Sequence, residues 1–226
     1  MRHIAPVPMA VPMPVPMLAT ALLLCAALAI ASAPWALGLQ ALNFIFKPLA
    51  TIVVIAHAWQ RGEGMALQRR WVLVGLVLSL AGDIALLWPQ QGFLPGLVSF
   101  LLAHMAYLVA FTRTQRLAAR PLVFIVYAVV AATLLTLLWP GVPGALRVPV
   151  VAYVLCLAAM AAQTAVLWRC GVERGAVLAL GGALFMASDA LLATNKFAGS
   201  LPLANLWILG SYWAAQWCIA SWLKPR

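Results

Sequence analysis

The chain has 226 residues, of which 66% are hydrophobic and only 8% are charged. A soluble globular domain carries about 45–50% apolar and about 25% charged residues, so this composition excludes an ordinary soluble domain and predicts a polytopic membrane protein. The formal net charge of +10 comes from basic residues in short gaps between apolar runs. That distribution indicates the cytoplasmic side of a membrane and not a nucleic-acid partner.

The first 16 residues form a proline-rich lead. The stretch APVPMAVPMPVP at 5–16 carries five prolines, which cannot lie in a helix interior and favour an extended segment. The first apolar run follows, from residue 17 to about 33, and ends in Ala-Ser-Ala, a sequence like a signal-peptidase site. Pro34 directly after it, and the proline-rich lead before it, favour a first helix that is retained.

Seven further apolar runs follow, each long enough to cross a bilayer, which takes roughly 20 residues. They lie at about 42–60, 71–88, 92–112, 121–138, 148–168, 175–194 and 203–223. The short connections between them are typical of antiparallel neighbours in a helix bundle. The sequence therefore predicts an all-α fold, in which a lead at 1–16 precedes a single domain of eight transmembrane helices at 17–226.

The basic residues divide unevenly between the two ends of this predicted bundle. Of the 14 Lys and Arg residues, Lys47 falls inside the second run, and Arg147 and Lys196 fall at the outer ends if the N-terminus is inside. The other eleven then lie on the inner side, which is the distribution of a cytoplasmic face. We predict that both termini are cytoplasmic and that the protein lies in a bacterial cytoplasmic (inner) membrane.

Two segments of the chain resemble each other. Residues 75–87, GLVLSLAGDIALL, and 181–193, GGALFMASDALLA, match in register at several positions, and the match aligns Asp83 with Asp189. The third and seventh predicted helices also run in the same direction. This pattern permits a parallel repeat of four helices plus four.

Asp83 and Asp189 are the acids that lie within predicted helices, whereas Glu63 and Glu173 lie in loops. An aspartate at the centre of a membrane helix costs about 2.5–3.5 kcal/mol on insertion scales, so both should face protein or a wet cavity. Lys47 has a similar predicted depth in the outer half, which predicts one polar chamber for all three groups. The alternatives are aspartates that only tie helices together, and a Lys47 side chain that extends to the membrane surface.

Other polar residues could complete this chamber. His104 lies near mid-membrane on the same predicted face as Tyr107, although a buried neutral histidine bonded to a neighbour would fit equally. The remaining candidates are Ser79, Ser188, Tyr212 and Gln216, each of which could also serve only in helix packing. The histidines lie at different depths and the four cysteines are scattered, so we predict no metal site.

Several stretches resemble one family in order and spacing. They are KPLAT (47–51), SLAGDIALL (79–87), FLPGLVSFLLAHMAY (93–107), GALFMASDALLA (182–193) and YWAAQ (212–216). Together they resemble the lysoplasmalogenase family of YhhN-type membrane proteins. The resemblance covers nearly the whole chain from the second helix to the eighth. The resemblance implies hydrolysis of the vinyl-ether bond of lysoplasmalogens to a fatty aldehyde and a glycerophospho-alcohol. It implies functional roles for the matching residues Lys47, Asp83, His104, Tyr107, Ser188 and Asp189.

Vinyl-ether cleavage begins with protonation of the alkene carbon, which creates an oxocarbenium ion that water attacks. Such a site needs a neutral acid and an ionised carboxylate, as in glycoside hydrolysis. Burial and a neighbouring like charge can keep one of two aspartates protonated. We therefore predict Asp83, Asp189 and His104 as catalytic, without assigning acid and base, and Lys47 or an interfacial arginine as the phosphate ligand. The predicted substrate-binding residues are Lys47, Tyr107, Ser79, Ser188, Tyr212 and Gln216.

The predicted partners are membrane lipids and a lysophospholipid with a vinyl-ether chain, and the sequence implies no cofactor and no protein partner. A proton-coupled transporter of lipids or small molecules would also place carboxylates inside the membrane. A purely structural protein is a third alternative.

Overall fold

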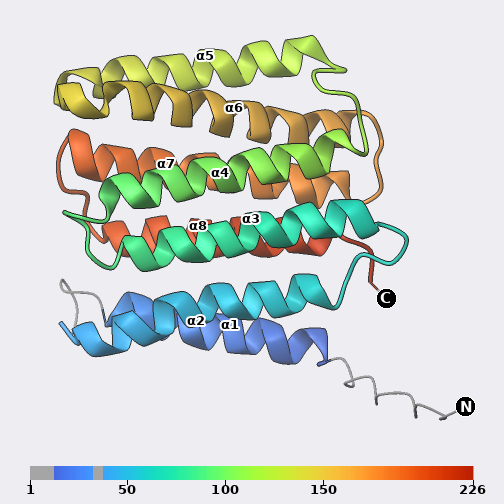
Figure 1. Cartoon of the computed structure of the whole chain (residues 1–226), viewed down its shortest axis with the longest axis horizontal. Helices are drawn as coiled ribbons and strands as arrows, with labels where there is room; N and C mark the ends of the chain where they lie inside the picture. Colours follow the sequence, from blue (N-terminus) through green and yellow to red (C-terminus); the bar gives the residue numbers. More distant parts are fainter. Residues whose placement is uncertain (1–12, 33–37, 226) are drawn as a thin grey trace, which may run out of the picture.

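The computed structural model describes residues 13–32 and 38–225, and its helices lie side by side in one bundle (Figure 1). In chain order they are α1 (Val15–Ala31), α2 (Gln40–Trp59), α3 (Ala66–Ala85), α4 (Phe93–Thr112), α5 (Pro121–Leu138), the 3-10 turns η1 (Trp139–Gly141) and η2 (Gly144–Leu146), α6 (Arg147–Arg169), α7 (Gly175–Phe197) and α8 (Ala204–Trp222). Within the described ranges no strand forms, and each predicted run corresponds to one helix. The predicted all-helical fold is therefore confirmed.

Some helix ends differ from the prediction. The third helix was expected to reach residue 88 but ends at Ala85, because tight turn hydrogen bonds replace the helical pattern just before Pro89. The seventh helix was expected to end near 194 but continues to Phe197. A glycine, Gly199, with a φ of +140° then turns the chain, a conformation that other residues rarely adopt.

The prolines near the start of the chain fit the beginning of α1. Pro14 is the residue before the helix and Pro16 lies in its first turn, where a missing backbone N–H has no helical partner to lose. Most of the predicted extended lead lies outside the described residues, as does the junction after Ser32.

Helices α2, α4, α5, α6 and α7 are long and apolar enough to cross a membrane, and α1 is a shorter apolar helix. The surface of the bundle carries many exposed large apolar side chains, such as Leu122, Leu137 and Val148. Exposure of so extensive an apolar surface to water is unfavourable, whereas its contact with lipid chains is not. The chain is therefore a polytopic membrane protein.

Helix α5 lies at the flank of the bundle (Figure 1). It packs mainly against α6, and Ala131 is the residue of α5 that is fully buried. The closest pairings elsewhere are α3 with α4 and α7 with α8, while α8 also contacts α2. The polar side chains described below lie among α2, α3, α4, α6, α7 and α8, and α5 closes one side.

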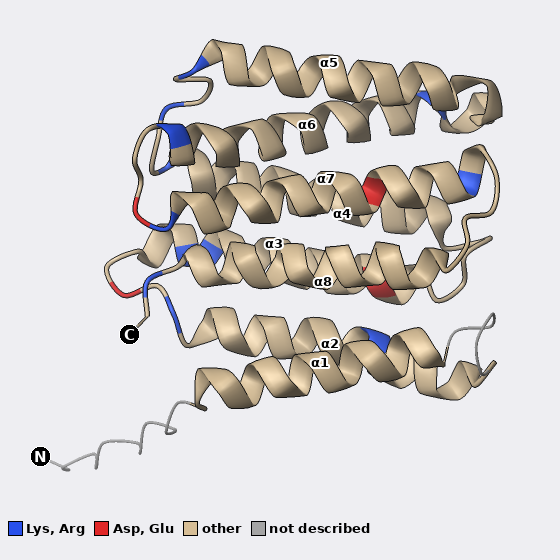
Figure 2. Cartoon of the chain, turned by 180° about the vertical axis from the view of Figure 1, so that it is seen from behind, with Lys and Arg blue, Asp and Glu red and all other residues tan. Residues whose placement is uncertain are grey.

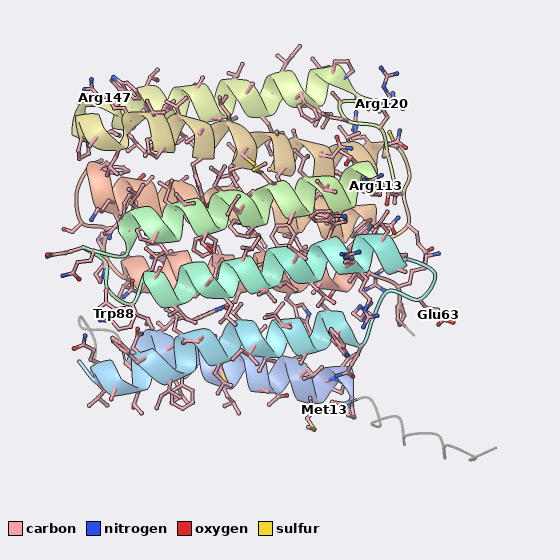
Figure 3. All side chains as sticks on the ribbon, in the orientation of Figure 1. Met13, Glu63, Trp88, Arg113, Arg120 and Arg147 are labelled. Carbon is pink, nitrogen blue, oxygen red and sulfur yellow. The ribbon has the colours of Figure 1, made fainter. Side chains whose placement is uncertain are left out.

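Most of the charged residues gather at one end of the bundle, which we call the basic end (Figure 2). It carries the loops 60–65, 113–120 and 170–174, and Met13 lies there too (Figure 3). The C-terminal segment is fixed at the same end, because Arg61 Nε donates to the carbonyl oxygen of Leu223 at 2.8 Å. Lys224 forms an ion pair of 2.8 Å with Glu173 and lowers the pKa of that carboxyl group. Both ends of the described chain thus lie on one side.

Candidate active site

Asp83 is the centre of a buried hydrogen-bond network between three helices. Its Oδ2 atom accepts hydrogen bonds from the hydroxyl groups of Thr51 on α2, at 2.6 Å, and Tyr212 on α8, at 2.8 Å. The indole of Trp213 in turn donates to Thr51 Oγ1 at 3.2 Å. Asp83 lies on α3 and is only 2% exposed, so these hydrogen bonds join α2, α3 and α8 in the interior of the bundle.

The network continues from Tyr212 into the core. Gln216 Nε2 donates to the Tyr212 hydroxyl at 3.3 Å, and the Tyr107 hydroxyl donates to Gln216 Oε1 at 2.7 Å. Ser79 Oγ lies 3.4 Å from the same Tyr107 hydroxyl. Four residues proposed as substrate contacts from the sequence therefore lie in one chain of hydrogen bonds that leads to Asp83.

Lys47 belongs to the same region. It lies on α2 one turn before Thr51, is 8% exposed, and interacts electrostatically with Asp83. Its burial favours a position inside the bundle over an extended side chain that reaches the membrane surface.

Asp189 lies in different surroundings, at the wall of a cavity of about 100 Å³ between α4, α5, α6 and α7. Tyr153 on α6 donates a hydrogen bond to its Oδ2 atom at 2.5 Å. Asp189 and Tyr153 are the polar side chains among the described lining residues. The apolar lining includes Leu97, Leu134, Leu135, Leu157, Met186 and Leu192. We call this space the Asp189 cavity.

Aromatic rings lie between the two aspartate sites. Phe100, Phe185 and Tyr212 contact one another edge to face, with ring centroids 5.6–6.5 Å apart, and we call these three residues the aromatic wall. Phe100 also lines the Asp189 cavity, while the Tyr212 hydroxyl bonds to Asp83. Each carboxyl group therefore has its own partners, and the aromatic wall connects their surroundings.

His104 lies beside this wall and is completely buried. Its ring stands edge-on to Phe185 and Tyr153, with centroid distances of 4.6 and 5.2 Å. Within the described part of the chain neither ring nitrogen has a hydrogen-bond partner, so the alternative of a histidine bonded to a neighbour is not observed. A buried polar atom without a partner costs about 1–3 kcal/mol, and such an atom in a native protein calls for an explanation, such as a water or a ligand.

Ser188 does not join either aspartate. Its hydroxyl donates to the carbonyl oxygen of Ile208 at 2.9 Å, a contact that ties α7 to α8. His57 lies near the basic end, where it bonds to Ser221 at 3.0 Å and stacks on Trp217. In the described ranges no group of three or more His, Cys, Asp or Glu side chains is arranged to hold a metal ion.

Sequence reasoning missed two partners of the aspartates, Thr51 and Tyr153, and also Trp213, which donates to Thr51. Thr51 could have been inferred, because it follows Lys47 by one helical turn and so shares its face. Tyr153 gave a weaker signal as a single tyrosine in the apolar run of α6. Its pairing with Asp189 depends on how α6 and α7 are rotated about their axes, which the sequence pattern does not define.

The chain is similar to one known family and to several named proteins. A profile of the YhhN family matches residues 42–223. The pig protein "Lysoplasmalogenase TMEM86B" is 36% identical over 75% of this chain and 69% of its own length. The human "Lysoplasmalogenase TMEM86A" is 38% identical over 66% and 63%, and the "Lysoplasmalogenase" of Mycobacterium bovis is 32% identical over 74% and 65%. This chain thus spans roughly two thirds of these relatives. No solved structure matches significantly.

Replacing Tyr107 by phenylalanine tests the network around Asp83. Tyr107→Phe removes the donor to Gln216 Oε1 and leaves that buried acceptor without its partner. We expect the free energy of unfolding to fall by about 1 kcal/mol, measured as a lower midpoint of thermal unfolding in detergent. Tyr127→Phe on α5 is the matched control, since this half-buried tyrosine lies outside the network. An equal change in both variants would contradict a stabilising role for the network.

Proposed function

Because the chain belongs to the YhhN family, and relatives that are 32–38% identical to it over the matched residues are named lysoplasmalogenases, we propose that it is a membrane hydrolase of the same kind. It cleaves the vinyl-ether bond of lysoplasmalogen-type lysolipids and releases a fatty aldehyde and a glycerophospho-alcohol. The observation that carries this proposal is a carboxyl group, Asp189, at the wall of an apolar cavity.

The cavity suits a part of the long apolar chain of such a substrate: its volume of about 100 Å³ accommodates a few methylene groups, and the rest of that chain extends past α5 into the bilayer. Leucine, phenylalanine and alanine side chains form most of its lining, so a hydrocarbon chain loses no hydrogen bonds on entry. Helix α5 forms one wall and packs mainly against α6. A lipid in the bilayer therefore needs to displace few contacts in order to enter beside this helix.

The partners of the two aspartates support different protonation states. Asp83 accepts hydrogen bonds from two hydroxyl groups and interacts electrostatically with Lys47, and such surroundings stabilise an ionised carboxylate. Asp189 lies among apolar side chains with a single phenol partner, and these surroundings favour the neutral acid. We assign Asp189 as the proton donor and Asp83 as the ionised partner.

The reaction then proceeds in balanced steps. The carboxyl group of Asp189 gives its proton to the alkene carbon, and the vinyl-ether oxygen shares the positive charge as an oxocarbenium ion. Water adds to the charged carbon and returns a proton to Asp189. The resulting hemiacetal collapses to the aldehyde and the glycerol hydroxyl, so one water is consumed. Tyr153 holds one oxygen of Asp189, which leaves the other free to carry the transferred proton.

The remaining polar groups assist these steps. The unpartnered nitrogens of His104 beside Tyr153 suit a water molecule, and in this position the histidine orients the attacking water, whose proton returns to Asp189. The negative charge of Asp83 lies on the other side of the aromatic wall, where it favours the positive charge that develops on the substrate. Tyr107, Tyr212 and Gln216 then hold Asp83 in position.

We further propose that all eight helices cross a bacterial inner membrane with the basic end in the cytoplasm, because Lys and Arg concentrate on that side. The Asp189 cavity then lies in the outer half of the membrane. Its lining includes Phe93 at the start of α4 and Phe197 at the end of α7, which belong to the end opposite the basic one.

The aspartates are tested by replacement with asparagine, which keeps their shape. We expect Asp189→Asn and Asp83→Asn to lower aldehyde release from a lysoplasmalogen by at least about 100-fold, the usual size of an acid–base contribution. Glu173→Gln, which removes a carboxylate at the basic end, should leave the rate unchanged. Near-normal release from either aspartate variant would remove that residue from the chemistry. Transport of the lipid in liposomes without any aldehyde would instead favour a transporter.

Chain binding is tested by filling the cavity from α5. Ala131→Trp places a large ring in the space that the substrate chain occupies, so we expect KM for a long-chain lysoplasmalogen to rise by about tenfold or more. Ala131 is 5% exposed, whereas its neighbour Val130 is 45% exposed and faces away. Val130→Trp is therefore the matched control. If both variants keep the wild-type KM while they remain folded, the chain binds elsewhere.

A further inference from the structure

Two basic residues stand apart from the basic end. Arg147 begins α6 and Lys196 lies in the last turn of α7, and Figure 3 shows Arg147 at the end of the bundle far from Glu63 and Arg113. Both side chains are exposed. The concentration of charge at the basic end (Figure 2) does not account for these two, and their surroundings suggest what they bind.

Each of the two cations lies over an aromatic ring. The Lys196 ammonium nitrogen is 4.9 Å from the centre of the Phe93 ring, and the Arg147 guanidinium carbon is 5.0 Å from the Trp139 ring. Phe93 lines the Asp189 cavity, as does Phe197 next to Lys196. The first cation is thus held at the edge of the cavity.

The turn that carries Trp139 borders the same edge. Leu138 and Val142 on either side of η1 line the cavity. Gly141 lies so close to Phe197 that an added Cβ atom would be 1.9 Å from the Phe197 carbonyl oxygen. The segments that hold Arg147 and Lys196 therefore meet at one mouth of the cavity.

Within the part of the chain that the structure describes, neither cation has an acidic partner. The chain has four acids: Glu173 pairs with Lys224 and Glu63 lies in a loop at the basic end, while Asp83 and Asp189 have the buried partners described above. Two unneutralised positive charges at the mouth of an apolar cavity suit a ligand with an apolar chain and an anionic head.

We propose that Lys196 and Arg147 form a phosphate subsite that binds the headgroup phosphodiester of the lysolipid. This inference rests on the proposed function, because it takes the alkenyl chain to lie in the Asp189 cavity. Asp189, Ala193 and Lys196 share one face of α7 at the i, i+4, i+7 spacing, and the rise of a helix separates the first from the last by about 10 Å. A glycerol unit and the flexible lysine side chain bridge that separation.

This assignment differs from a phosphate contact at Lys47, which is buried beside Asp83. Lysine binds phosphate as a point charge and arginine can bind two of its oxygens at once. The same charges could hold a phosphate of the bulk bilayer, and the test must separate that contact from one made by the reacting lipid.

The test compares two substrates in mixed micelles of a neutral detergent: a lysoplasmalogen with a phosphocholine head, and the 1-alkenylglycerol that lacks the phosphate. For Lys196→Gln and Arg147→Gln we expect KM for the phosphorylated substrate to rise about tenfold, the effect of one charge-assisted hydrogen bond, with kcat unchanged. KM for the alkenylglycerol should stay at the wild-type value. Lys196→Arg should retain most of the affinity. Arg116→Gln, which removes an exposed arginine at the basic end, is the control.

Two results would overturn the subsite: an unchanged KM for the phosphorylated substrate, or an equal rise for both substrates, which would indicate a structural or bilayer-anchoring role. If the wild-type protein releases no aldehyde from either substrate, the proposed function fails. In that case binding of an uncleavable 1-alkyl lysophosphocholine is compared with that of the 1-alkylglycerol by tryptophan fluorescence. Selective loss of the phosphorylated ligand in Lys196→Gln supports the subsite without the reaction, and equal binding by variant and wild type refutes it.

Discussion

Hydrogen bonds directed toward the Asp83 carboxylate hold the centre of this bundle together. Tyr107 donates to Gln216, Gln216 to Tyr212 and Tyr212 to Asp83. A second series of hydrogen bonds reaches the same carboxylate through Thr51. A carboxylate inside a membrane must obtain from the protein the hydrogen bonds that water would otherwise supply. Asp83 accepts these hydrogen bonds from Thr51 on α2 and Tyr212 on α8, and it thereby fixes how the two helices pack against α3. The aromatic wall is fixed with them, because Tyr212 belongs to both.

The second aspartate contrasts with the first although its sequence surroundings are similar. Asp189 receives one hydrogen bond and otherwise borders an apolar cavity. The difference arises from the neighbouring helices: Asp83 faces the polar side chains of α2 and α8, whereas Asp189 faces α5 and α6, which supply mainly aliphatic groups. Two carboxyl groups in such unlike surroundings can serve as acid and as counter-charge without a metal, and this is the chemical basis of the proposed hydrolysis.

Much of this arrangement follows from the sequence, and the part that does not has a physical reason. Apolar runs predicted all the helices, because a lipid-facing helix must be apolar over most of its length. The polar residues within those runs predicted most members of the Asp83 network, because a polar group in a membrane is stabilised by another polar group. These members are Ser79, Tyr107, Tyr212 and Gln216, but not Thr51 or Trp213. Depth alone, however, suggested one chamber for both aspartates. The rotation of each helix about its axis decides which neighbours a side chain meets, and it is set by packing such as the contact of Phe100 with Tyr212. Tyr153 and the aromatic wall could not be inferred for the same reason.

The central claim is that Asp189 is a neutral acid while Asp83 is ionised, and infrared spectroscopy of the purified protein at neutral pH measures this directly. The carbonyl stretch of a protonated carboxyl group is separate from the bands of a carboxylate. We expect one such protonated band in the wild-type protein, its loss in Asp189→Asn and its retention in Asp83→Asn. A band that disappears in Asp83→Asn but persists in Asp189→Asn would contradict the assignment, and the absence of any protonated band would remove the proton donor on which the mechanism depends.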